Sequence, residues 1–413
     1  FRGPIRGMTA PDPPVPAPRK RFEPLPEWVG PSTRAVHSGR RDDLNAGAVA
    51  FPIYATSTYR YPAEYSEARH QGDVHLYTRL DNPTQEVAAE LLRSLEGAEA
   101  ARVFGSGMGA MSATLLTFLS PGDEVVALED LYGGTLDLLR GLLPRFGVQV
   151  RFVSNAEASR PEDCVSPRTR VVLLESPTNP LLRVHDLRRW AEVATRTGAL
   201  TVVDNSVATP LNQSPLACGI DVVVHSASKA LGGHSDLIAG AVAGTAEHLA
   251  RIERTHSVLG SPLDPFAAFL LTRGMKTLAL RVERQSENGR KVFAAVRGHP
   301  KVRAAHYPGA DDTASEAIAR KQMRGRSGLV AFELAGGAEA ARRFLHGLRL
   351  VEVASSFGGV ESLVSVPSET SHRGLTPAEA ESRGIRPGLV RLSCGIEESD
   401  DIVRDVTSAL DGA

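Results

Sequence analysis

The sequence predicts an α/β protein with a mostly parallel sheet and a smaller C-terminal α+β domain. From about Tyr77 onward, short β-branched runs alternate with helical patterns. These runs are apolar almost throughout, which is typical of parallel strands covered by helices on both faces. After about Asp264 the alternation gives way to one long helical stretch, Pro265–Val296. The pattern then predicts strands at Arg303–Tyr307 and Gly328–Leu334, a helix from Ala338, and strands near Leu350 and Leu389.

The first clear helix of the large domain begins at Asn82. Asn82 can cap it, Pro83 suits the first helical position, and Gln85 would complete a capping box. Gly97 ends the helix. Its apolar stripe consists of Val87, Leu91, Leu92 and Leu95.

The strands of the large sheet follow this helix. Ala101–Phe104 leads into the glycine-rich turn Gly105–Gly109 and an apolar helix that reaches about Leu119. Helical patterns near Thr135–Leu143 and Asp186–Thr195 separate several of the later strands. Those strands are expected at Asp123–Leu128, Val148–Val153, Arg170–Glu175, Leu200–Asp204 and Asp221–His225.

Composition and charge limit the classes of partner. Of the 413 residues, 42% are hydrophobic and 23% are charged, and the net charge is −1. A balanced charge argues against nucleic acid or an anionic membrane as a partner. The chain lacks an apolar run of about 18 residues, so no transmembrane segment is expected. Nine of the 27 prolines fall within residues 1–31, which we expect to be a disordered, proline-rich leader.

Cysteine and histidine usage points to a reduced, cytoplasmic enzyme without a metal. Cys164, Cys218 and Cys394 lie far apart and would leave one thiol unpaired in any disulfide scheme. His225 and His234 have no carboxylate or cysteine at ligand spacing, so no metal site is predicted.

The residues that follow the apolar strands carry the chemistry. In open α/β sheets, ligands gather at the carboxyl ends of the strands. A glycine-rich turn that opens a helix, as at Gly105–Gly109, can hold a phosphate. Asp204 can hold a protonated ring nitrogen, and Lys229 can condense with an aldehyde. A phosphate, an aldehyde and a pyridinium together describe pyridoxal 5′-phosphate (PLP).

Each of these residues also has an ordinary structural interpretation when it is taken alone. Gly105–Gly109 is more often a plain strand–helix turn or a dinucleotide loop, and it lacks the full GxGxxG spacing. Lys229 alone would be a solvated loop lysine, Arg391 a surface ion pair, and Asp204 a cap or turn residue. Tyr132 alone would be a half-buried packing residue. The ordered combination favours the cofactor site over these separate interpretations.

Motifs along nearly the whole chain strengthen this interpretation. Ser226–Asp236 resembles the lysine motif of the Cys/Met-metabolism PLP enzymes, the transsulfuration family. The resemblance runs from about Ser32 to Ile402. The other matching segments, in the family's order, are Tyr77–Thr84, Phe104–Met108, Tyr132–Thr135, Glu175–Pro180, Ser356–Ser362 and Arg391–Ser393.

The resemblance implies an architecture and an assembly. The fold would be PLP-dependent transferase-like, that is, of the aspartate aminotransferase or fold type I class, with a seven-stranded sheet. Residues 32–75 would form an arm that contributes to a neighbouring subunit, 76–263 the PLP-binding large domain, and 264–413 the small domain. The chain would form a homotetramer, a dimer of dimers in which each dimer shares its active sites.

The resemblance also implies the roles of individual residues. Lys229 would hold PLP covalently and move protons between substrate carbons, while Tyr132 would stack on the ring and act as acid or base. Asp204 would keep the pyridine nitrogen protonated. The phosphate would be bound by Gly107, Met108, Ser226 and Ser228, and by Tyr77 and Arg79 of the neighbouring subunit. The substrate carboxylate would be bound by Arg391, with Ser356 and Asn179 assisting.

The substrate is predicted less closely than the cofactor. We expect PLP-dependent γ-replacement or γ-elimination on a homoserine-derived or cystathionine-type amino acid, as in cystathionine γ-synthases and γ-lyases. Gly134 stands where methionine γ-lyases typically carry cysteine, and Ser355 where many cystathionine enzymes carry glutamate. Methionine γ-lyase, homoserine sulfhydrylase and a specialised biosynthetic γ-replacement enzyme remain alternatives. Alternatives from other classes are a nucleotide-binding oxidoreductase that uses Gly105–Gly109 and a non-catalytic binding module.

Overall fold

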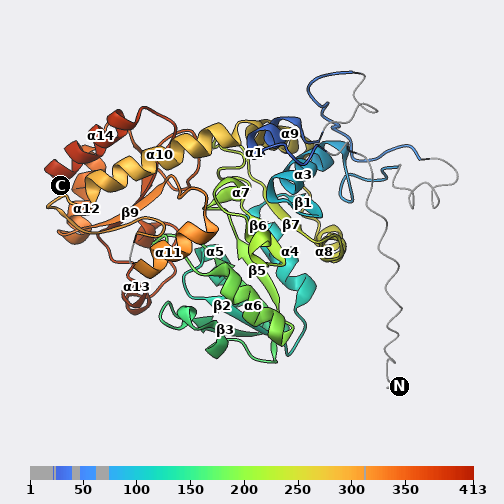
Figure 1. Ribbon diagram of the computed structural model, residues 1–413, viewed down its shortest axis with the longest axis horizontal. Helices are drawn as coiled ribbons and strands as arrows, with labels where there is room; N and C mark the ends of the chain where they lie inside the picture. Colours follow the sequence, from blue (N-terminus) through green and yellow to red (C-terminus); the bar gives the residue numbers. More distant parts are fainter. Residues whose placement is uncertain (1–21, 23–24, 40–46, 62–73, 311–312) are drawn as a thin grey trace.

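The computed structural model describes residues 22, 25–39, 47–61, 74–310 and 313–413 (Figure 1). The predicted leader, residues 1–31, lies mostly outside the described residues, and the predicted arm, residues 32–75, lies partly outside them. In the described part of the chain, no helix is long and apolar enough to cross a membrane.

A seven-stranded sheet forms the larger part of the molecule, as the sequence predicts. Its strand order is β1-β7-β6-β5-β4-β2-β3. Every strand is parallel to its neighbours except β7, which runs antiparallel to both β1 and β6. The strands are β1 (Ala100–Phe104), β2 (Glu124–Leu128), β3 (Gln149–Val153), β4 (Thr169–Glu175), β5 (Leu200–Asp204), β6 (Val222–His225) and β7 (Gly240–Gly244).

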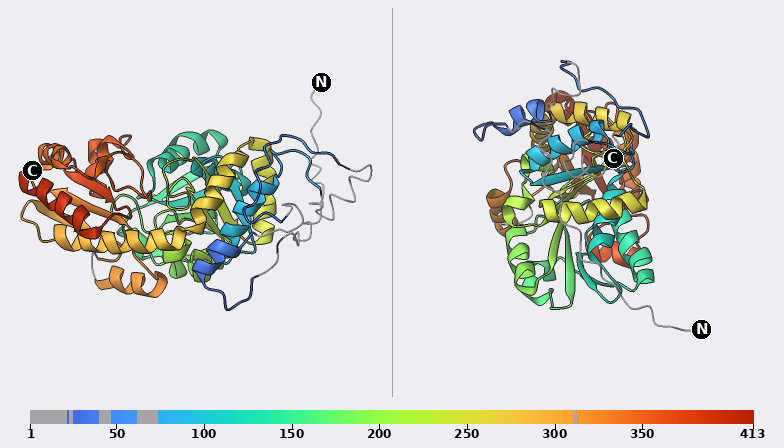
Figure 2. Two further views of the ribbon diagram at one scale, coloured as in Figure 1. Left: turned by 90° about the horizontal axis from the view of Figure 1, so that it is seen from above. Right: turned by 90° about the vertical axis from the view of Figure 1, so that its right-hand side faces the viewer.

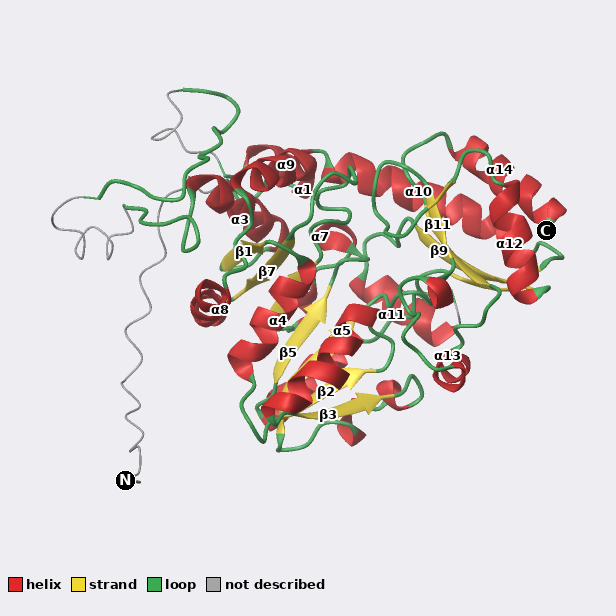
Figure 3. Ribbon diagram, turned by 180° about the vertical axis from the view of Figure 1, so that it is seen from behind, coloured by secondary structure: helices red, strands yellow, loops and turns green. Residues whose placement is uncertain are grey.

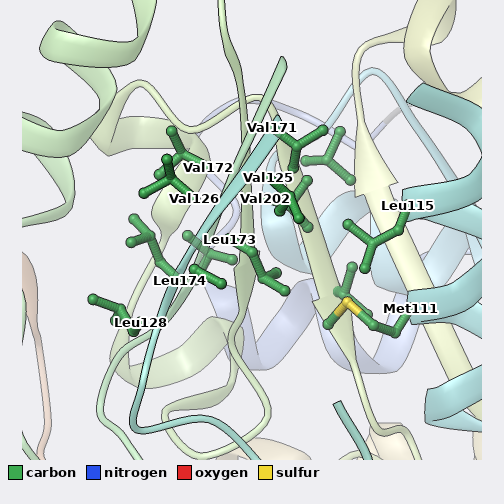
Figure 4. Packing of buried hydrophobic residues seen from close by; sticks show 14 of the residues in the cluster. Met111, Leu115, Val125, Val126, Leu128, Val171, Val172, Leu173, Leu174 and Val202 are labelled. Atoms are coloured by element: carbon green, nitrogen blue, oxygen red, sulfur yellow. The ribbon is translucent and has the colours of Figure 1, made fainter. Parts of the chain in front are cut away.

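The core of this part lies between the sheet and the helices on its two faces. Met111 and Leu115 of α4 (Gly107–Phe118) pack onto valines of the central strands (Figure 4). On the other face, α3 (Pro83–Glu96) and α9 (Pro265–Lys276) share a second apolar cluster. The remaining helices of this part are α1 (Pro31–His37), α5 (Gly133–Asp137), α6 (Leu187–Thr197), α7 (Thr209–Asn212) and α8 (Ala246–Leu259).

The start and the end of α3 follow the predicted signals, with one correction. The Asn82 side chain accepts a hydrogen bond from the Thr84 N–H, and Gly97 adopts a left-handed conformation at the C-terminus. Gln85 does not complete a capping box, because its side-chain amide donates to the Leu263 carbonyl instead. A buried tertiary acceptor therefore replaces the local one.

Two predicted helices are interrupted in the structure. The segment predicted as one helix at Thr135–Leu143 consists of α5, a π-helical turn at Leu138–Leu142 and a 3₁₀ turn at Leu143–Phe146. The stretch Pro265–Val296 divides at Thr277 into α9 and α10 (Leu278–Val296). Figures 1 and 2 show α10 running from the large sheet to the C-terminal part of the molecule.

A five-stranded sheet forms the C-terminal part. Its order is β10-β11-β12-β9-β8, and all neighbouring pairs are antiparallel except β10 and β11. Figure 3 shows α10, α12 and α14 close to this sheet. The strands are β8 (Val302–His306), β9 (Leu329–Leu334), β10 (Glu352–Val353), β11 (Leu363–Ser365) and β12 (Leu389–Ser393). The helices are α11 (Thr313–Gln322), α12 (Gly337–Gly347), α13 (Pro377–Arg383) and α14 (Ser399–Gly412).

Candidate active site

The candidate site lies where the carboxyl ends of the central parallel strands meet loops from the C-terminal sheet. Asp204 ends β5 and is the register partner of Glu175, which ends β4. Lys229 lies four residues beyond the end of β6. The two sheets meet at Lys229 and Ser356, because the Lys229 Nζ donates to the Ser356 Oγ at 2.8 Å.

Lys229 lies in surroundings that favour its neutral amine. Burial lowers the pKa of Lys229 to about 8, and the positive charge of Arg391 lowers it further than the Asp204 carboxylate raises it. The Phe357 ring centroid lies 5.2 Å from Nζ and covers one side of the amine. A neutral amine is the form that attacks an aldehyde, so the geometry suits covalent attachment of one.

Arg391, on β12, has the geometry of a carboxylate-binding residue. Its side chain donates to the Asn179 Oδ1 and to the Ser356 carbonyl, both at 2.8 Å, so its guanidinium plane is fixed. Its Nε atom is buried and has no hydrogen-bond partner among the described residues. Burial lowers the pKa of Arg391 to about 10. A buried N–H without an acceptor is costly, and a substrate carboxylate would supply the missing acceptor.

Ser356 connects the lysine and the arginine through an unusual backbone conformation. Its φ angle is 91°, a region that residues other than glycine rarely adopt. In this conformation its hydroxyl accepts from Lys229 while its carbonyl accepts from Arg391. Such strain occurs mostly at functional sites, where the surrounding structure maintains it.

Asp204 fits a cationic partner. Burial raises the pKa of the Asp204 carboxyl more than its hydrogen bonds with Ser206 and the charges of His225 and Lys229 lower it. The Ser206 N–H donates to its Oδ1 at 2.9 Å. A protonated ring nitrogen beside Asp204 would stabilise the carboxylate form.

The two predicted phosphate-binding segments also meet. A Cβ atom on Gly107 would lie 3.0 Å from the Ser226 Cα, so glycine permits this close approach of the two backbones. Gly107 and Met108 begin α4, where backbone N–H groups have no intrahelical acceptor. The Ser226 hydroxyl has no partner among the described residues, whereas the Ser228 hydroxyl bonds both polar backbone atoms of Ala239. The backbone N–H groups of Gly107 and Met108 and the Ser226 hydroxyl therefore fit a phosphate. The Ser228 hydroxyl is not free for one in this structure, because it is bonded to Ala239.

Tyr132 is held by a buried carboxyl group that the sequence analysis gives no role. Its backbone N–H donates to the Glu175 Oε2 at 3.0 Å, and the residue is 43% exposed. A Cβ on Gly134 would lie 2.7 Å from the Tyr132 ring, so this glycine lets the ring occupy its position. Burial, with Asp204 alongside, raises the pKa of Glu175 well above its usual range. The sequence signals for Glu175 are its place at a strand end and at the start of the matching segment Glu175–Pro180.

Tyr77 and Arg79 lie apart from the other predicted phosphate ligands of their own chain. Arg79 donates to the Ser257 carbonyl near the end of α8, and its guanidinium lies 5.8 Å from the Tyr77 ring centroid. Within the described residues it makes no hydrogen bond to Gly107, Met108, Ser226 or Ser228.

Comparison with known proteins decides the family. Residues 32–411 match the family described as Cys/Met metabolism PLP-dependent enzyme. The chain belongs to that family. It is a PLP-dependent enzyme, which confirms the predicted resemblance and cofactor. Family membership also excludes the two alternatives from other classes, a nucleotide-binding oxidoreductase and a non-catalytic binding module.

Similar proteins cover almost the whole chain. L-methionine gamma-lyase from Pseudomonas putida is 42% identical over 386 residues, which are 92% of this chain and 97% of that protein. Cystathionine gamma-lyase from Bacillus subtilis (strain 168) is 39% identical over 382 residues, which are 92% of this chain and 98% of that protein.

Solved structures of this family agree with the fold described above. Cystathionine gamma synthase from Xanthomonas oryzae pv. oryzae, in complex with aminoacrylate and cysteine, has a TM-score of 0.87 at 36% identity, covering 93% of this chain and 98% of that one. Cystathionine gamma-lyase from Lactobacillus plantarum, complexed with L-serine, has a TM-score of 0.87 at 34% identity, covering 93% of this chain and 99% of that one. These likenesses confirm the PLP-dependent transferase-like fold class.

Proposed function

We propose that this enzyme catalyses γ-elimination or γ-replacement on a cystathionine-type or homoserine-derived L-amino acid. The observation that carries the proposal is the connected group of Lys229, Ser356 and Arg391, which places an amine beside a carboxylate-binding guanidinium. In γ-elimination the Cγ–S bond breaks, and hydrolysis gives a thiol, a 2-oxo acid and ammonia. In γ-replacement an incoming thiol bonds to Cγ as the leaving group departs.

PLP, when bound, supplies an electron sink for the charge left at the substrate Cα. Arg391 would hold the substrate carboxylate through Nε and one Nη, which orients the rest of the amino acid. Lys229, joined to the same arginine through Ser356, would then lie near the Cα hydrogen and could carry a proton between carbons. Tyr132, at the opening of α5, would exchange a proton with the leaving group.

Asp204 and the phosphate-binding groups would hold the two ends of the cofactor. Asp204 would bond the ring nitrogen, while Gly107, Met108 and Ser226 would bind the phosphate at the start of α4. We propose Ser228 for the same role only after its hydroxyl leaves Ala239, which it bonds in this structure.

We further propose a homo-oligomer in which Tyr77 and Arg79 complete the site of a neighbouring subunit. In support, Tyr77 is 42% exposed, Val258, which follows the Arg79 contact at Ser257, is 86% exposed, and Phe266, at the start of α9, is 57% exposed. Large exposed apolar side chains are typical of interfaces. The tetramer and the division at residues 76–263 and 264–413 stay predictions, as does the cytoplasmic compartment, which the three buried, unpaired cysteines support.

A substrate panel tests the reaction. The holoenzyme is incubated with L-cystathionine, with L-methionine, and with an O-acylated L-homoserine plus cysteine, and Lys229→Ala is the control. We expect 2-oxobutanoate from the first or cystathionine from the last, in either case with PLP bound. A PLP-loaded protein that forms neither product from any of these substrates refutes the proposal.

A further inference from the structure

A buried ion pair lies on the α3 side of the sheet, outside the groups used so far. Glu96 is the last residue of α3, and His225 is the last residue of β6. The Glu96 Oε1 and the His225 Nε2 are 2.6 Å apart, with side-chain exposures of 0% and 1%. The pair is therefore shielded from solvent.

Hydrogen bonds extend from this pair to the ends of three adjacent strands. The Asn205 side-chain amide donates to the Glu96 Oε1 at 3.3 Å and to the Gln213 carbonyl at 3.1 Å. The Gln213 amide donates to the Asn205 Oδ1 at 3.0 Å and to the Ser176 carbonyl at 2.6 Å. Ser176, Asn205 and His225 mark the carboxyl ends of β4, β5 and β6, so the network fixes these ends relative to one another.

The strand ends that the pair connects bear the proposed cofactor ligands. Asn205 directly follows Asp204, and His225 directly precedes Ser226. A second connection joins the same two strands, because the Ser206 hydroxyl accepts from the Ser226 N–H at 2.6 Å while the Ser206 N–H donates to Asp204. The two strand ends are thus connected twice through side chains, in addition to the backbone hydrogen bond from the Asn205 N–H to the Val224 carbonyl.

Stability alone does not account for the pair. Apolar residues of similar size usually hold a core at least as well as a buried ion pair does. The Glu96 Oε2 and the His225 Nδ1 are also buried without a partner among the described residues, which costs stability. A directional constraint between β5 and β6 is what the pair adds.

We propose that Glu96 and His225 are positioning residues for PLP, fixing the separation between Asp204 and Ser226. PLP is rigid along the line from its ring nitrogen to its phosphate arm, so a strand-end shift of about 0.5 Å would misalign one end when the other is bound. The inference rests on the proposed roles of Asp204 and Ser226, but not on the identity of the substrate.

The same two strands supply a matched control at their opposite ends. Near the amino ends of β5 and β6, the Asp221 Oδ2 accepts from the Thr201 N–H at 2.8 Å and from the Thr201 hydroxyl at 2.7 Å. Asp221→Asn perturbs a connection between these strands that lies away from the cofactor ligands. It therefore reports the effect of weakening the sheet alone.

The experiment compares His225→Leu, His225→Gln and Asp221→Asn. Each holoenzyme is resolved from its cofactor, and the apoenzyme is titrated with PLP while the visible band and the melting temperature are recorded. His225→Leu should raise the PLP Kd about tenfold or more, as loss of supporting partners does at other ligand sites. His225→Gln, whose amide can reach the Nε2 position, should restore most of the affinity. Asp221→Asn should lower the melting temperature and leave the Kd unchanged.

Unchanged PLP affinity in His225→Leu, with only a lower melting temperature, overturns the inference. If that variant does not fold, Glu96→Met takes its place, because it keeps the approximate size of the side chain and removes the oxygen that contacts His225 and Asn205; an unchanged Kd there has the same meaning. Asp204→Asn in the same titration tests the role of Asp204 separately from that of the Glu96–His225 pair. If it also has no effect on the affinity or the band, the proposed role of Asp204 fails rather than that of the pair alone.

Discussion

Replacing Arg391 with lysine separates the geometry of the carboxylate site from its charge. The arginine plane is fixed by Asn179 and Ser356, and its Nε, which has no partner among the residues that the structure describes, can donate to one carboxylate oxygen. Lysine keeps the positive charge but presents a single nitrogen, so at least one of two charge-assisted hydrogen bonds to the substrate is lost. Such a bond contributes about 2 kcal/mol, which corresponds to about a 30-fold rise in KM.

The assay is steady-state release of 2-oxo acid, with PLP occupancy measured from the visible band. Because the charge beside Lys229 is retained, Arg391→Lys should bind PLP normally and lose substrate affinity. Arg189→Lys, which alters a surface arginine–carboxylate pair with Glu162, is the matched control and should leave KM unchanged. Loss of PLP with an unchanged KM would show that Arg391 does not bind the substrate carboxylate.

Three further predictions test other parts of the site. The rate at which the apoenzyme captures PLP should rise with pH through about 8, because only the neutral amine attacks the aldehyde and burial lowers the pKa of Lys229 to about 8; a rate that climbs only near the ordinary lysine pKa of about 10 would contradict this. Gly134→Cys should displace the Tyr132 ring and change the ratio of activities on L-methionine and L-cystathionine, since a Cβ there would lie 2.7 Å from the ring; equal ratios in the two proteins would argue against a role for this contact. Equal amounts of Lys229→Ala and Arg79→Ala, mixed with subunit exchange, should recover about a quarter of the wild-type activity if sites are shared, and verified exchange without recovery would exclude sharing.

Much of the candidate site follows from the sequence because the residues proposed to act in it lie at or shortly after the ends of buried strands. The parallel strands carry Asp204 and the Lys229 loop to the same edge of the sheet, and the strand ending at Asp204 has the bounds predicted for it. β7 was not predicted, because Gly240–Gly244 is rich in small residues and lacks a β-branched run. Its position between β1 and β6 depends on antiparallel pairing with both strands, and β1 is more than 130 residues earlier in the sequence.

Contacts between distant buried polar groups are the features that the sequence does not predict. Glu96 and His225 are separated by 129 residues, and neither has a local pattern that marks a buried ion pair. Gln85 likewise has the spacing of a capping residue but bonds to Leu263, because a buried amide takes whichever acceptor the tertiary structure supplies. Periodicity indicates which face of an element is apolar, and it carries no information on which polar side chain that face will meet.

The arrangement of the site also indicates why two sheets are needed for one reaction. Lys229 follows the large sheet, whereas Arg391 lies within the five-stranded sheet, and Ser356 bonds both. Burial lowers the pKa of Lys229 most, and the charge of Arg391 lowers it further, so the packing of the two sheets favours the neutral, reactive amine. The connection between Lys229 and Arg391 depends on the left-handed conformation of Ser356. With an ordinary negative φ angle, either the Ser356 carbonyl or its hydroxyl would turn away from its partner. The same contact thus connects the amine of Lys229 to Arg391, the residue proposed to bind the substrate carboxylate.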